Sequence, residues 1–114
     1  MKILVAMLLM ALSAHAAAAK PQDAAFDAAF DRQKGRIYAL YRKALQEKPR
    51  LAGKIVYDID IAQTGNVSAC RIRSSTLGSP ALEGKICEVI LQLKIPAQQK
   101  GFTITKPVDF FPAG

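Results

Sequence analysis

The chain has 114 residues and a formal charge of +7, from 16 Lys and Arg against 9 Asp and Glu. This length is enough for one small domain and too short for two. The only histidine, His15, lies in an N-terminal leader, so the rest of the chain lacks the commonest general base and metal ligand. The composition disfavours hydrolases and metalloenzymes. We expect no catalytic residues, no metal and no cofactor.

Residues 1–19 have the layout of a secretory signal peptide, in which a positive charge precedes an apolar run and small residues. Lys2 supplies the charge, Ile3 to Ala14 the run, and Ala14-His15-Ala16 or Ala16-Ala17-Ala18 the cleavage site. The run is shorter than the roughly 20 residues that span a bilayer, which disfavours the alternative of an uncleaved anchor. We therefore expect a single domain, residues 20–114, exported across the inner membrane to the periplasm without a transmembrane span. Loss of Lys2 lowers its charge from +7 to +6.

One long helix is predicted from Asp23 to Lys48, where Pro49 ends it. Apolar side chains recur along it at helical spacing, which predicts one buried face. These side chains are Phe26, Phe30, Ile37, Tyr41 and Leu45.

The segment from Gly53 to Ser74 predicts a β-hairpin closed by Thr64-Gly65. Its first arm alternates apolar and polar side chains, as a half-buried strand does. With those two residues in the loop, the core face pairs Tyr57 with Ile72, Ile59 with Cys70, and Ile61 with Ser68. Val67 then points outward, which is a misfit of this register.

The other face of the hairpin carries charges of opposite sign. The same register places Asp58 opposite Arg71, Asp60 opposite Ala69, and Arg73 beside Val56. We interpret Asp58 and Asp60 as a solvated strand face paired with arginines, because cross-strand charge pairing accounts for them. The alternative, a metal or acid–base pair, lacks a third carboxylate nearby in the sequence.

A second helix is predicted from Ser79, as N-cap, to about Lys94, with Pro80 at its first position. Its buried stripe is Leu82, Ile86, Val89, Ile90 and Leu93. Cys87 lies beside this stripe, and Cys70 faces the helices. Because an exported chain is in an oxidising compartment, we predict a Cys70–Cys87 disulfide; the alternative is two buried thiols.

The last strand is predicted from Phe102 to Phe110, interrupted by Pro107. A proline cannot donate to a sheet ladder, so this strand should lie at an edge. We predict an α+β fold of order α-β-β-α-β. Two helices pack on one face of a three-stranded antiparallel sheet, and the last strand pairs beside the first.

Three segments resemble the C-terminal domain of TonB-like energy transducers, in the AgmX/PglI C-terminal branch. They are RQKGRIYALYRKAL (32–45), GKIVYDIDIAQTGNVSACRIRSSTLGSPALE (53–83) and TITKPVDFFP (103–112). Relatives carry a Trp-x-Phe-Pro-like element after the second helix, where this chain has Leu93-Lys94-Ile95-Pro96. The resemblance implies a small periplasmic domain with a pairing edge. Without an anchor or proline-rich spacer, it does not imply the force-transducing role of TonB.

The predicted binding site is the edge strand, which an extended peptide could join by β-augmentation. Thr103, Thr105 and Asp109 alternate away from the apolar side chains and are the residues expected to tune this contact. The alternative is that Lys106 and Pro107 protect the edge from pairing.

The expected partner is a protein or peptide of the cell envelope. The charge also favours an anionic surface, although basic residues are spread along the chain as on a generic solubilising surface. No recognised motif for specific nucleic-acid binding is present. We therefore expect an interaction module, an adaptor or accessory subunit of an envelope complex; the alternative is an inhibitor or immunity-type protein that binds an envelope enzyme or toxin.

Overall fold

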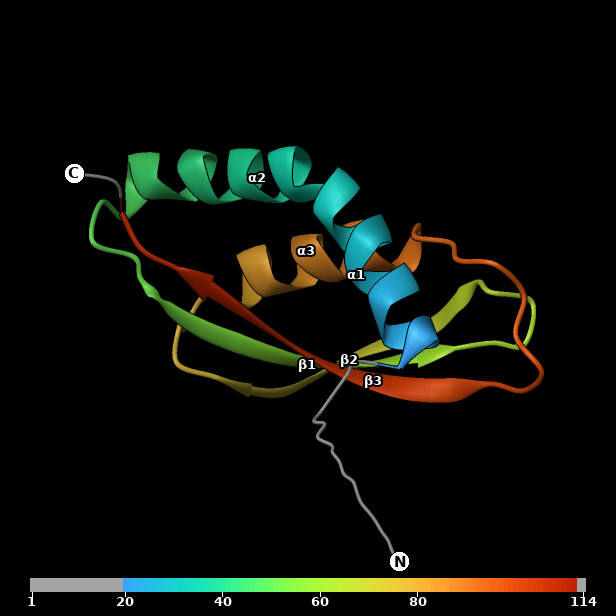
Figure 1. Cartoon of the computed structure of the whole chain (residues 1–114). Coiled ribbons are helices and arrows are strands. Elements are labelled where there is room, and N and C mark those ends of the chain that lie inside the picture. Colours follow the sequence, from blue (N-terminus) through green and yellow to red (C-terminus); the bar gives the residue numbers. More distant parts are fainter. Residues whose placement is uncertain (1–19, 113–114) are drawn as a thin grey trace, which may run out of the picture.

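The computed structural model describes residues 20–112, so the predicted signal peptide lies outside the described residues. Among the described residues the three helices lie on one face of the sheet, and its other face carries none of them (Figure 1). The strand order is β2-β1-β3, with both pairs antiparallel. This confirms the α+β class and the last strand's place beside the first. The elements are α1 (Pro21–Arg32), α2 (Lys34–Glu47), β1 (Gly53–Ile61), β2 (Val67–Ser75), α3 (Pro80–Leu91) and β3 (Phe102–Phe110).

The prediction of one long helix from Asp23 to Lys48 is wrong, because the chain bends at Gln33 between α1 and α2 (Figure 1). Gln33 leaves helical geometry, with φ −103° and ψ 5°, and its N–H donates to the Phe30 carbonyl at 2.9 Å. The bend lets apolar side chains on both sides of it reach the core. The residues buried in this way are Phe26, Ala29, Phe30, Ile37 and Tyr41.

The core lies between the helices and the inner face of the sheet. Its sheet side is centred on β1, where Ile55, Tyr57, Ile59 and Ile61 are buried, and the predicted stripe of the second helix packs there too. Buried phenols need hydrogen-bond partners. The Tyr57 hydroxyl donates to the Glu83 carbonyl at 3.0 Å, and the Tyr41 hydroxyl donates to the Leu51 carbonyl. Burial, and to a smaller extent the Glu83 carboxylate, raises the pKa of Tyr57, which keeps the phenol a neutral donor.

The predicted hairpin register is confirmed at its centre, where Tyr57 pairs with Ile72, Asp58 with Arg71, Ile59 with Cys70 and Asp60 with Ala69. It is wrong at both ends. Ile61 pairs with Val67 instead of Ser68, and Val56 pairs with Ser74 instead of Arg73. Ser68 and Arg73 are therefore extra residues, each forming an irregularity in β2. The first of these turns Val67 inward, to 9% exposure, which removes the misfit.

The predicted disulfide is confirmed: Cys70 of β2 is bonded to Cys87 of α3, with their Cα atoms 5.8 Å apart. It ties an edge strand of the sheet to the helical layer. The end of the second helix differs from the prediction, since α3 stops at Leu91 instead of near Lys94. Leu93 is nevertheless buried, as its place in the apolar stripe predicted.

Candidate binding edge and open face of the sheet

The free edge of β3 carries a regular row of outward backbone groups. The direction of these groups follows from a bond on the other side of β1. Directly after β2, the Thr76 N–H donates to the Lys54 carbonyl of β1 at 2.8 Å. Because backbone groups alternate in direction along a strand, even-numbered residues of β1 bond toward β2 and odd-numbered residues toward β3. The residues of β3 opposite the even-numbered ones therefore point their backbone groups away from the sheet. These residues are Thr103, Thr105, Pro107 and Asp109.

Pro107 occupies one of these outward positions, so its missing N–H removes no bond to β1. The N–H groups of Thr103, Thr105 and Asp109 face the free edge. All nine residues of β3 pair with β1 without a register shift, from Phe102 opposite Ile61 to Phe110 opposite Gly53. The predicted edge position of this strand is confirmed.

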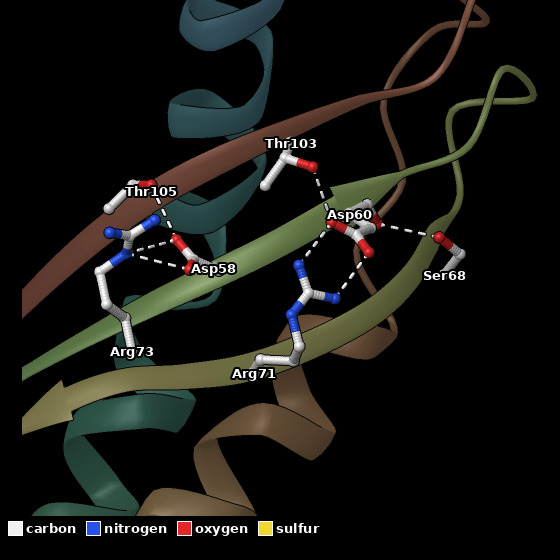
Figure 2. Close-up of polar contacts among 7 residues, drawn as sticks. All are labelled: Asp58, Asp60, Ser68, Arg71, Arg73, Thr103 and Thr105. Atoms are coloured by element: carbon white, nitrogen blue, oxygen red, sulfur yellow. Dashed lines mark hydrogen bonds and ion pairs between the residues drawn. The ribbon is translucent and has the colours of Figure 1, made fainter.

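The predicted site side chains are all exposed, and two of them are held by β1 (Figure 2). The Thr103 hydroxyl donates to Asp60 Oδ1 and the Thr105 hydroxyl to Asp58 Oδ1, each at 2.8 Å. Asp109 lies four residues beyond Thr105, opposite Lys54. The structure therefore brings Thr103 and Thr105 together on the open face and leaves Asp109 near the far end of β3.

Two arginines of β2 complete a polar ladder across the open face (Figure 2). Arg71 donates two hydrogen bonds to Asp60, at 2.6 and 2.9 Å, and Arg73 Nε lies 3.0 Å from both carboxylate oxygens of Asp58. The backbone register sets Asp58 opposite Arg71, but the side chains pair diagonally. The predicted pairing of these carboxylates with arginines is confirmed, with diagonal partners instead of directly opposite ones.

These bonds fix the protonation of both carboxylates. Hydrogen bonds, from Arg71 first and then Thr103, lower the pKa of Asp60 to about 2. Arg73 first, and Thr105 next, lower the pKa of Asp58. Carboxylates held ionised in this way are poor proton carriers near neutral pH. Within residues 20–112 no group of three or more His, Cys, Asp or Glu side chains is placed to hold a metal ion.

A hollow of about 210 Å³ lies beside the β3 edge on the helical side. It is lined by Phe30, Lys34, Ile37 and Tyr38 of the helices and by residues 106–109 of β3. Tyr38 is 41% exposed, and its ring meets that of Phe110 edge-on at 5.7 Å between centroids. The sequence alone does not predict this hollow, because its shape depends on how α1 and α2 lie over β3.

Lys106 faces the helices and not the solvent edge. Its ammonium lies 3.0 Å from Asp27 Oδ1 and 4.8 Å from the centre of the Phe30 ring, and 21% of its side chain is exposed. An inward charge is one device by which edge strands avoid pairing. Here the charge is already paired within the domain. The sequence signal for the inward orientation of Lys106 is its position midway between Ile104 and Val108, since every second residue of a strand faces the same side of the sheet.

The opposite edge of the sheet, β2, is irregular. Extra residues at Ser68 and Arg73 interrupt its pairing with β1, and the disulfide at Cys70 ties it to α3. Such irregularities twist an edge and make it a poor template for another strand. Of the two edges, β3 is thus the better template.

No protein-family model, curated protein or solved structure matches this chain. Among residues 20–112, no helix has the length and apolar character needed to cross a membrane.

Proposed function

We propose that this protein is an exported periplasmic interaction module without catalytic activity, an adaptor or accessory subunit of a cell-envelope complex. In this proposal it is a TonB-like domain of the AgmX/PglI branch that binds an extended protein segment by β-augmentation at β3. The observation that carries the proposal is the continuous register of β3 on β1, which leaves the N–H groups of Thr103, Thr105 and Asp109 facing the free edge; at Pro107 only the carbonyl is offered. Main-chain hydrogen bonds give such complexes their affinity, and side-chain pockets beside the edge give specificity.

The surroundings of the edge indicate what the added segment would contain. Alternate side chains of an added strand face opposite sides of the sheet. On the helical side they would meet Lys34 and Tyr38 in the hollow beside β3. An acidic or aromatic side chain suits this position, because it would pair with the ammonium or stack on the ring.

The disulfide supports the exported part of the proposal. Cys70 and Cys87 form a bond that is rare in proteins of a reducing cytosol and common in secreted ones. The short apolar run at the N-terminus supports the same compartment. Mass measurement of the intact exported protein tests this part: the proposal expects a chain that starts between Ala17 and Lys20, and retention of Met1 in a membrane fraction would contradict it.

A proline scan of the two edges tests the binding mode. Thr105→Pro removes an outward N–H from β3, whereas Ile72→Pro removes one from β2, where Ile72 lies opposite Tyr57. Thr105→Val is the matched control, because it loses the hydroxyl bonded to Asp58 but keeps the N–H. The probe is a set of 12-residue peptides selected by display of random sequences on the unmodified protein.

We expect Thr105→Pro to weaken peptide binding by on the order of tenfold, as the loss of backbone pairing at an edge implies. Ile72→Pro and Thr105→Val should bind nearly as well as the unmodified protein. Circular dichroism of each variant verifies that the fold is kept. Equal loss on Ile72→Pro, or full binding by Thr105→Pro, would contradict the proposed edge.

A further inference from the structure

The first turn of α3 and the last turns of α2 enclose a hollow of about 200 Å³, lined on the α3 side by Ser79, Ala81, Leu82 and Lys85. The α2 side and the residue after it contribute Leu40, Lys43, Ala44, Glu47 and Lys48. None of these residues lines the hollow beside β3. An inference about this place is therefore independent of the proposed peptide edge.

Ser79 carries a buried hydroxyl that has no partner within residues 20–112. The residue is 8% exposed and is the N-cap of α3, yet its side chain makes no capping hydrogen bond. Only its backbone is engaged: the N–H donates to Glu83 Oε2 at 3.0 Å, and the carbonyl accepts from the Glu83 N–H at 2.9 Å. The N-cap position predicted for Ser79 is thus right, but its hydroxyl caps no amide, and among the described residues the only backbone N–H that donates to the Glu83 carboxylate is that of Ser79 itself. Buried hydroxyls nearly always have a partner, in the protein or in water, so the hydroxyl of Ser79 is available to a molecule bound in the hollow.

Two backbone amides at the same place also lack acceptors among the described residues. Pro80 has no N–H, and the N–H groups of Ala81 and Leu82 precede the first intrahelical bond of α3. Glu83 does not line the hollow; besides Ser79 it accepts from the Ser75 hydroxyl at 2.9 Å. The amides and the helix dipole together favour an anion beside Ser79.

The charge and polarity of the lining narrow the class of anion. Lys43, Lys48 and Lys85 form no ion pair within residues 20–112, and Glu47 is the single acidic residue of the lining. Lysine binds phosphate as a point charge, and a phosphoryl group offers several oxygens to a set of donors. Leu40, Ala44 and Leu82 add apolar surface to the same hollow.

We propose that this hollow binds a phosphate ester that carries an apolar chain. The Ser79 hydroxyl and the Ala81 and Leu82 amides donate to the phosphoryl oxygens. Lys43, Lys48 and Lys85 balance the charge of the phosphoryl group, while the chain lies on Leu40 and Ala44. The same chemistry occurs in a free ester and in a phospholipid headgroup, so the experiment separates these sources.

The test is a titration of the nitrogen-15-labelled protein, as isolated from expressing cells, with hexyl phosphate and with inorganic phosphate at constant ionic strength. We expect hexyl phosphate to shift the amide signals of Ala81 and Leu82, and inorganic phosphate to shift them with weaker affinity. Ser79→Ala should weaken binding by on the order of tenfold, as loss of a hydrogen bond to a charged group does. Lys85→Gln should weaken it several-fold.

Lys100→Gln is the matched control, because it removes the same charge from an exposed loop residue outside the hollow. An equal loss in Lys85→Gln and Lys100→Gln would overturn the proposal, as would unmoved Ala81 and Leu82 signals. Equal affinity for both probes would overturn the apolar contact. Sedimentation with phosphatidylcholine vesicles containing phosphatidic acid separates the sources: binding that Lys85→Gln weakens supports a headgroup, and hexyl phosphate binding without sedimentation supports a free ester.

Discussion

The two edges of the sheet are built in opposite ways. β2 holds two irregularities, at Ser68 and Arg73, and a disulfide from Cys70 to α3. β3 pairs with β1 in one continuous register, and its side chains contact the helices without a covalent bond. Since a regular edge is a template for another strand and an irregular one is not, the comparison teaches where pairing with a partner is possible.

The same comparison separates stability from binding. The β2 edge is where the domain is reinforced, and the β3 edge is where we expect contact with a partner. Changes at β2 should therefore alter the free energy of unfolding more than peptide affinity. Changes at the outward positions of β3 should alter peptide affinity more than the free energy of unfolding.

The largest expected effect on stability comes from removing the disulfide. Replacing Cys70 and Cys87 together with alanine opens a loop of 17 residues. For a loop of this size the free energy of unfolding should fall by about 3 kcal/mol. Urea denaturation of the double variant measures the loss, with Ser74→Ala in the exposed part of β2 as control. A loss below about 1 kcal/mol would show that the disulfide is not the main reinforcement of this edge.

A smaller effect is expected where β3 contacts α1. Lys106→Met keeps a long apolar side chain but removes the ion pair with Asp27 and the ammonium over the Phe30 ring. Half of the Asp27 side chain is exposed, so the loss should be about 1 kcal/mol or less by the same denaturation assay. If Lys106 instead protects the edge, the variant would self-associate at concentrations where the unmodified protein is monomeric, which sedimentation velocity detects.

The smallest effect is expected from Asp60, which binds Arg71 of one edge strand and Thr103 of the other. Its folded-state pKa of about 2 lies below the ordinary value, so the ionised form stabilises the fold. This stability is present above pH 4 and is lost as the pH falls toward 2. The unmodified protein should thus exceed Asp60→Asn in melting temperature at pH 7, and the two should converge near pH 2.

Asp31→Asn is the control for this pH series. Its pair with Lys34 is more than half exposed on both sides and should contribute little. A melting-temperature difference between the unmodified protein and Asp60→Asn that stayed constant from pH 7 to pH 2 would contradict the role of the ladder.

Much of the fold could be predicted because local patterns agree with the tertiary structure. Alternation along β1 identified its buried face, and the place of Cys70 opposite Ile59 in the hairpin register led to the disulfide. The helix bend at Gln33 was not predicted, because no proline marks it; its weaker signals are Gly35 and the absence of apolar side chains from residues 31–36. The irregularities in β2 had one sequence signal, the outward Val67, because a buried valine favours a shifted register.

The candidate sites depend more on tertiary contacts. The edge position of β3 was predictable from Pro107, and the exposure of Thr103, Thr105 and Asp109 from alternation. Their bonds to β1 were not, because they depend on how two distant strands align. The hollow at Ser79 was not predictable for a similar reason: a serine before a proline predicts an ordinary N-cap, and only the folded chain shows that its hydroxyl caps no amide.

Hydrogen exchange of backbone amides tests the central claim, that β3 is the pairing edge, most directly. The Thr103, Thr105 and Asp109 amides should exchange rapidly in the free protein and slowly with a display-selected peptide bound. The Cys70 and Ile72 amides, which point outward from β2, should exchange at the same rates in both states. Protection that appears at Cys70 and Ile72, with Thr103, Thr105 and Asp109 unchanged, would contradict the account.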